Sequence, residues 1–155
     1  MPQKLSQFIE APVETVFACV ANPELQKLYN PDFVQITYPE GRDPSRLAGE
    51  KFVYHFRQGG QIQQSLCETI AFEPPEHLAV RMEAGMWTVL VDYRLDSVPG
   101  GTEVHLEVDT QFHSGFLRFF SGLLGLAQHT ELRRRLQTLK EFAERIAQSP
   151  VDSSE

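Results

Sequence analysis

Few polar side chains occupy the positions of the predicted sheet that could enclose a ligand. The strands alternate apolar and polar residues, and the apolar set is interrupted only by Tyr54, Gln64, Glu68, Tyr93 and Thr110. Glu68 is the single carboxylate of this set, so it is the candidate general base or the candidate partner for a polar ligand group. The hydroxyls of Tyr54 and Tyr93 could donate hydrogen bonds to a ligand oxygen.

These residues also have a purely structural interpretation, which the sequence leaves open. A bulge in the strand that carries Glu68 would turn its side chain to the opposite face, and a place at the mouth of a cavity would leave it in solvent. Tyr54 and Tyr93 could belong to an aromatic core, with their hydroxyls reaching the edge. Met82 and Trp87 would add an adaptable apolar wall in either case.

The sequence contains no motif that names a reaction. G-x-S-x-G, the P-loop, G-x-G-x-x-G and His-x-x-x-His are all absent. His55, His77 and His105 alternate with the apolar positions and are expected to face solvent, whereas His129 lies in the last helix. We therefore predict no metal, no cofactor and, unless Glu68 acts as a base, no enzymatic activity.

Strands make up most of the scaffold that must position these side chains. A first strand at 4–10 precedes two short helices at 12–20 and 24–29, whose limits are set by Pro12, Pro23 and Pro31. Turns rich in Gly and Pro then separate six segments of period two, at 33–38, 50–58, 62–72, 78–82, 87–96 and 104–112. The expected fold class is α+β, with a curved antiparallel sheet of about seven strands around a long C-terminal helix.

The long helix is expected between His113 and Ser149. Its second half carries a stripe at helical spacing, formed by Leu132, Leu136, Leu139, Phe142, Ala143 and Ile146. The apolar stripe of the first half, 116–127, is centred roughly 120° away, at about 100° per residue. We therefore expect a break, kink or change of neighbour between Gly125 and Thr130. A short helix followed by a long one and a flexible lid are the two interpretations.

Composition narrows the class of protein. The net charge of −7 argues against nucleic acid as a partner, since phosphate binding needs clustered Lys and Arg. No stretch reaches the roughly 20 apolar residues of an integral membrane segment, and the start lacks the apolar run of a signal peptide. Cys19 and Cys67 are expected to be reduced core residues of a cytoplasmic protein. A single domain at 1–149 and a disordered tail at 150–155 are predicted; a homodimer is left open.

Four stretches resemble the polyketide cyclase/dehydrase group of the START-like (SRPBCC, helix-grip) superfamily. They are IEAPVETVFACVANPEL, FEPPEHLAVR, YRLDSVPGGTEVHLEV and RLQTLKEFAE, and the resemblance covers about Lys4 to Ala147. It implies a deep cavity between the sheet and the long helix. It does not imply one function, because the superfamily carries ligand transport, lipid binding and cyclase or dehydratase chemistry on the same scaffold.

The first functional hypothesis is the binding of a small hydrophobic or amphipathic ligand, such as a lipid, a polyketide or an aromatic metabolite. The predicted ligand-binding residues share the inward positions and the start of the helix: Tyr54, Phe56, Gln64, Glu68, Met82, Trp87, Val89, Tyr93, Thr110, Phe116 and Phe120. One alternative is a cyclase or dehydratase that uses Glu68 as its base and Tyr54 or Tyr93 as oxyanion donor. Another is an interaction protein that docks through 116–127.

The entrance of the cavity is expected at two segments that look least costly to move. These are the start of the long helix, with Phe116 and Phe120, and the loop from Pro39 to Gly49. Three glycines soften the first segment, and the loop has few apolar anchors. Both are predicted to be more mobile than the sheet.

Overall fold

The computed structural model describes residues 2–39, 48–83, 85, 87–113 and 121–148; for 121–128 it describes the backbone alone. The strands are β1 (Pro2–Ile9), β2 (Phe33–Thr37), β3 (Lys51–Gln58), β4 (Gln61–Glu73), β5 (His77–Glu83), β6 (Trp87–Val98) and β7 (Gly101–Phe112). The helices of this part of the chain are α1 (Val13–Ala21), α2 (Pro23–Tyr29) and α4 (Ser121–Ala147). The predicted order of one strand, two short helices, six strands and a long helix is confirmed.

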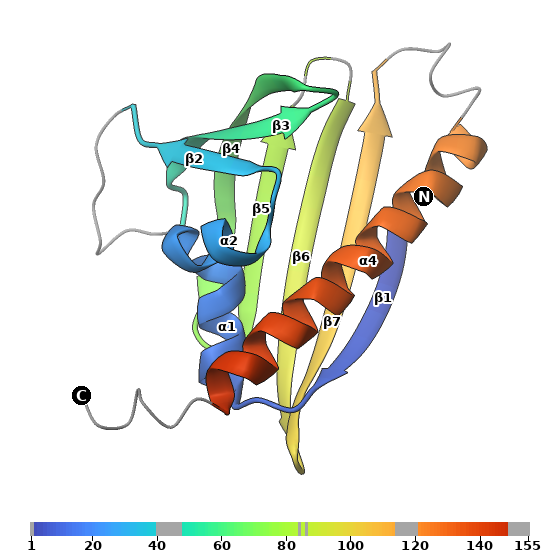
Figure 1. Ribbon diagram of the computed structural model, residues 1–155. Helices are drawn as coiled ribbons and strands as arrows, with labels where there is room; N and C mark the ends of the chain where they lie inside the picture. The colour runs from blue at the N-terminus through green and yellow to red at the C-terminus, as the bar shows by residue number, and fades with distance from the viewer. Residues whose placement is uncertain (1, 40–47, 84, 86, 114–120, 149–155) are drawn as a thin grey trace.

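All seven strands belong to one antiparallel sheet in the order β1-β7-β6-β5-β4-β3-β2. Figure 1 shows the sheet curving around the helices, with α4 crossing its inner face diagonally in front of β6, β7 and β1. The short helices α1 and α2 lie beside the C-terminal half of α4. This is the predicted helix-grip arrangement. The helices cover only one face of the antiparallel sheet, the face that carries its apolar side chains.

The second half of α4 supplies its side of the core. Leu136, Leu139, Phe142 and Ala143 are buried against residues of β1, β7 and α1, as the stripe predicted. The opposite face is exposed and polar, and there Gln137 Nε2 donates a hydrogen bond of 3.1 Å to Glu141 Oε2 at helical spacing. Burial on one face and charge on the other fix the rotation of the helix on the sheet.

Of the break, kink or change of neighbour expected between Gly125 and Thr130, the break is wrong, and the change of neighbour depends on side chains that lie outside the described ones. The helix continues through both residues from Ser121 to Ala147. Glycine costs only roughly 1 kcal/mol in a helix, so Gly122 and Gly125 weaken the ladder of backbone hydrogen bonds without ending it. The apolar side chains of 116–127 fall outside the described residues, and so does the predicted tail at 150–155.

The β6–β7 hairpin is attached tightly to the end of β1. A Cβ atom on Gly101 would overlap the carbonyl oxygen of Ile9 and stand 3.1 Å from the Cα atom of Glu10, so only glycine fits this approach of two backbones. The buried hydroxyl of Thr102 donates a hydrogen bond of 2.8 Å to the carbonyl oxygen of Ala11. These contacts set the point at which the chain leaves the sheet and enters α1.

Candidate functional site

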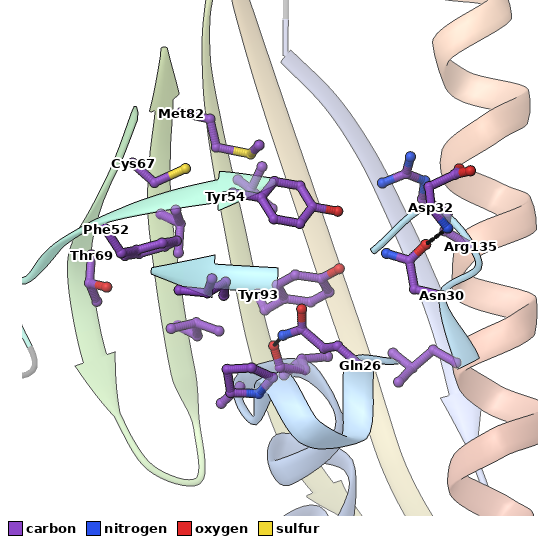
Figure 2. A pocket seen from close by; sticks show the side chains of 18 of the residues that line it. Gln26, Asn30, Asp32, Phe52, Tyr54, Cys67, Thr69, Met82, Tyr93 and Arg135 are labelled. Carbon is purple, nitrogen blue, oxygen red and sulfur yellow. Dashed lines mark hydrogen bonds between the residues drawn. The ribbon is translucent and has the colours of Figure 1, made fainter. Parts of the chain in front are cut away.

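A cavity of about 250 Å³ lies between the inner face of the sheet, helix α2 and the middle of α4. Figure 2 shows side chains from β3, β4, β5 and β6 on one side and residues of α2 and α4 on the other. The volume is just below the range of about 300–1,000 Å³ that is common for ligand pockets. It therefore suits a small ligand.

Strands supply most of the apolar wall of this cavity. The wall residues are Phe52 from β3, Cys67 and Phe72 from β4, Val80 and Met82 from β5 and Val91 from β6. Helix α4 adds Leu139, and the end of α1 adds Val20. A surface of this kind attracts the hydrocarbon part of a ligand, because apolar area is removed from water on both partners.

Three tyrosines bring hydroxyl groups to the cavity. The Tyr29 hydroxyl donates a hydrogen bond of 2.8 Å to the carbonyl oxygen of Cys19. Figure 2 shows the hydroxyls of Tyr54 and Tyr93 pointing toward the side of α4. Burial raises the pKa of all three, and the Arg135 charge lowers each only in part. At neutral pH they are therefore uncharged hydroxyls that can donate and accept.

The polar end of the cavity is formed by the connection between α2 and β2, Asn30 to Asp32, facing Glu131, Arg134 and Arg135 of α4. Asn30 Oδ1 accepts a hydrogen bond of 3.1 Å from the backbone N–H of Asp32, which fixes the turn (Figure 2). Glu131 accepts from Arg134 at 2.5 Å and from Arg135 at 3.1 Å. Hydrogen bonds from Arg134 and Arg135 lower the pKa of the Glu131 carboxyl group despite some burial.

The side chains of this end are the most solvent-exposed of the lining. The Arg135 side chain is 51% exposed and the Arg134 side chain 61%. The cavity therefore has an apolar interior and a charged end that meets water. Among the residues that the structure describes, no group of three or more His, Cys, Asp or Glu side chains could hold a metal ion.

Only part of the predicted site surrounds this cavity. Tyr54, Met82 and Tyr93 line it. Phe56 stacks on Tyr54, with ring centroids 5.1 Å apart, and Trp87 packs edge to face on Phe112 at 5.9 Å. Val89 packs against the core beside its cross-strand neighbour Thr110. Phe56, Trp87, Val89 and Thr110 do not contribute to the lining.

The predicted orientation of Gln64 and Glu68 is wrong. The inward residues of β4 are Ser65, Cys67 and Thr69, all buried, whereas Leu66 between them is 52% exposed. Both Gln64 and Glu68 share the outward parity of Leu66. The Glu68 carboxylate accepts a hydrogen bond of 2.5 Å from Arg81 Nη2 on the outer face of the sheet.

A β-bulge in β4 explains why the alternation of its residues gave the wrong orientation for Gln64 and Glu68. The pairing of β4 with β5 shifts register between Thr69 and Ala71, so Ile70 is an extra residue and the alternation reverses there. Phe72, two residues later, lines the cavity and meets Phe17 edge to face at 5.6 Å. Leu66 and Phe72 therefore have the same parity in the sequence and lie on opposite faces of the sheet.

Two further predictions concern residues at the periphery. Of the three histidines expected to face solvent, the His105 side chain is 46% exposed, as predicted, and His55 is half-buried. His77 is only 14% exposed, with Nε2 at 2.9 Å from Asp92 and Nδ1 at 3.3 Å from Glu73. These carboxylates satisfy an imidazole in the outer face. Phe116, Phe120 and most of the loop from Pro39 to Gly49 lie outside the described residues, so the predicted entrance there stays a prediction. Within the described lining, the exposed side chains of Arg134 and Arg135 mark an end that meets solvent.

The polar end was missed by sequence reasoning. Tyr29, Asn30 and Asp32 lie at the end of a seven-residue helix, and Arg135 belongs to a run of three arginines that matches no site motif. One signal was available: Asn30-Pro31-Asp32 is a turn sequence placed directly after a tyrosine. The meeting of that turn with α4, about a hundred residues later, is a property of the tertiary fold.

The arrangement of seven antiparallel strands around a long C-terminal helix, with a cavity between them, defines the START-like, helix-grip class of proteins. Residues 4–144 match the family described as polyketide cyclase / dehydrase and lipid transport. The chain belongs to this family. No curated protein matches it.

Solved structures share the fold over nearly the whole chain. A protein from Thermus thermophilus is 16% identical, with a TM-score of 0.74 over 96% of this chain and 100% of that one. A Rhodobacter sphaeroides protein is 18% identical, with a TM-score of 0.73 over 94% and 93% of the two chains. The structure of Ara h 8.0201 is 14% identical, with a TM-score of 0.71 over 95% and 97%. At these identities the likeness concerns the fold alone.

None of the helices that the structure describes is both long and apolar enough to cross a membrane. Cys19 and Cys67 are both buried and form no disulfide, as predicted.

Proposed function

We propose that this domain binds one small amphipathic ligand in the cavity between the sheet and α4. The observation that carries the proposal is the cavity itself: its interior is apolar and aromatic, and its polar groups gather at one end. Family and fold are consistent with ligand binding and with cyclase-like chemistry. Binding has the better support, because it needs only the enclosed apolar surface and the few orienting polar groups.

The enzymatic alternative requires Glu68 as a general base inside the cavity. Glu68 pairs with Arg81 on the outer face, so it cannot act as a base on a ligand in the cavity. The docking alternative rests on the side chains of 116–127, which lie outside the described residues. Neither alternative gains support from the described part of the structure.

The binding proposal is tested with a pair of variants on neighbouring residues. Cys67 is 2% exposed and lines the cavity, whereas Leu66 is on the outer face. Cys67→Trp should fill part of the cavity, and Leu66→Trp adds the same side chain where there is space. Val80→Phe fills the cavity from β5 and serves as a second filling variant if Cys67→Trp does not fold.

The measurement is isothermal titration with naphthalene-2-carboxamide, an uncharged bicyclic probe, together with native mass spectrometry of the purified protein. We expect the wild type and Leu66→Trp to bind the probe, and the folded filling variants to lose at least about tenfold in affinity. Equal affinity in Cys67→Trp, Val80→Phe and wild type would place binding elsewhere and contradict the proposal. Absence of probe binding, together with no small molecule retained in native mass spectra, would also count against it.

A further inference from the structure

The polar end of the cavity has hydrogen-bond donors whose partners are not supplied by the described protein. The Tyr29 hydroxyl is satisfied by Cys19, but among the residues that the structure describes the Tyr93 hydroxyl has no hydrogen bond. A hydroxyl that faces the cavity is free to donate a hydrogen bond to a bound ligand in place of water. Figure 2 shows this hydroxyl directed toward the side of α4, parallel to that of Tyr54.

Arg135 provides the second set of donors at the same end. Its Nε donates to Glu131 at 3.1 Å, and within the described part of the chain its two terminal Nη groups donate to no residue. The guanidinium is planar, and the pair of parallel N–H groups that remains matches the two oxygens of a carboxylate. Arg135 lines the same cavity as Tyr54 and Tyr93, and Figure 2 shows both tyrosine hydroxyls directed to the side of the cavity on which Arg135 lies.

The charges around this end are balanced, so net attraction alone would not select an anion. Arg134 and Arg135 face Glu131 and Asp32, and Glu131 is shared between the two arginines. A further carboxylate, Glu50, lines the cavity just before β3, so the whole lining has three acidic and two basic side chains. Selectivity therefore has to come from directed hydrogen bonds, made where partial exposure keeps the desolvation of an anion small.

We propose that the ligand is an organic acid, with an apolar body in the cavity and a carboxylate held by the Arg135 guanidinium and the Tyr93 hydroxyl. This inference rests on the proposed function, because it identifies the polar group of the ligand bound at the same site. The carboxylate lies at the solvent end between α2 and α4, and the hydrocarbon part points toward Cys67, Val80 and Met82.

The test compares naphthalene-2-carboxylate with naphthalene-2-carboxamide, which has the same shape and no charge. Both are titrated at pH 7 into wild type, Arg135→Gln, Tyr93→Phe and Arg133→Gln. Arg133 is an exposed residue of the same helix that does not line the cavity, so its substitution changes the net charge equally and serves as the matched control. Tyr93→Phe keeps the ring and removes the hydroxyl alone.

We expect wild type to bind the acid at least about tenfold more tightly than the amide. Arg135→Gln and Tyr93→Phe should each reduce acid affinity by about tenfold and leave amide affinity within about threefold, and Arg133→Gln should change neither. Asp32→Asn, which removes a negative charge that acts on Tyr54, should strengthen acid binding.

The outcomes separate the two proposals. If the amide binds as tightly as the acid, loses affinity in Cys67→Trp and ignores Arg135→Gln, the carboxylate assignment is overturned and the cavity remains the binding site. If Arg133→Gln weakens the acid as much as Arg135→Gln, the effect is one of net charge and the assignment also fails. If neither probe binds wild type, both proposals are contradicted.

Discussion

The hydroxyl of Tyr29 donates a hydrogen bond of 2.8 Å to the carbonyl oxygen of Cys19, and so ties the end of α2 to α1. The Tyr29 ring also packs on Phe142 of α4, with centroids 5.0 Å apart. One side chain thus connects the three helices around the cavity. The turn that follows it, Asn30 to Asp32, is held in place at the polar end by the same contacts.

Tyr29→Phe should lower the free energy of unfolding by about 1 kcal/mol, since it removes one hydrogen bond and keeps the ring. Tyr93→Phe is the matched control, because the Tyr93 hydroxyl has no hydrogen bond to the described residues; it should be neutral or slightly stabilising. Urea denaturation followed by circular dichroism measures both. A cost for Tyr93→Phe equal to that for Tyr29→Phe would contradict this distinction.

Gly101→Ala should be strongly destabilising. Its Cβ would overlap the carbonyl oxygen of Ile9, and backbone cannot move aside as a flexible side chain can. We expect a loss of about 3 kcal/mol or more. Gly59→Ala, in the β3–β4 hairpin, has nothing within 4 Å of the added atom and should lose only about 1 kcal/mol for its φ of +61°. Thermal unfolding of both variants decides whether the close approach matters.

Glu144 should contribute to the pH dependence of stability. Its carboxylate accepts a hydrogen bond of 2.9 Å from the backbone N–H of Glu10 and pairs with Lys140, and these contacts lower its pKa below the usual value. A lowered pKa means stability that is present above the unfolded-state pKa and is lost as the pH falls through the folded-state pKa. Glu144→Gln should therefore reduce stability by about 1 kcal/mol at pH 7 and flatten its decline between roughly pH 5 and pH 3.

The control for this experiment is Glu107→Gln, an exposed carboxylate of β7. It should leave the pH profile of the unfolding free energy unchanged. A wild-type profile that is already flat below about pH 5 would show that the Glu10 contact contributes nothing.

Both cysteines should be inert in the folded protein. Burial raises the pKa of Cys19 and of Cys67 to about 11, so at pH 8 only about 0.1% of either thiol is ionised, and the thiolate is the reactive form. We expect Ellman's reagent to react slowly with native protein and to titrate both thiols quickly in urea. Because the folded-state pKa is raised, this contribution to stability is complete below about pH 9 and declines as the pH rises through about 11. Rapid native labelling would mean that the cavity opens widely.

Much of the fold could be predicted from the sequence because the second half of α4 is unambiguous. The second half of the helix has a single apolar stripe, which includes Leu136, Leu139 and Phe142 at helical spacing. All three are buried in the structure. The hairpins were equally clear, since the Gly59-Gly60 and Pro99–Gly101 turns stand between segments of period two. Both signals come from residues close together in the chain, and the structure agrees with both.

The orientation of β4 could not be predicted for a physical reason. Its outer face carries Ile62, Leu66 and Ile70, which are exposed, while its inner face carries the small residues Ser65, Cys67 and Thr69. A packed core would favour large apolar side chains on the inside. A cavity requires the reverse, because small inward side chains leave the space that a ligand fills. Small inward and large outward side chains in β4 are therefore consistent with a cavity on the inner face of the sheet.

The pairing of β1 has a consequence for the order in which the domain forms. Among the described strands it pairs with β7 alone, with Pro2 opposite Asp109, whereas β2 to β7 each pair with a strand adjacent in the chain. During synthesis the hairpins of the meander can close as they emerge, but β1 waits unpaired until nearly all the remaining chain has been made. The strand that precedes the other six in the chain is therefore among the last to join the sheet, where α4 packs against it.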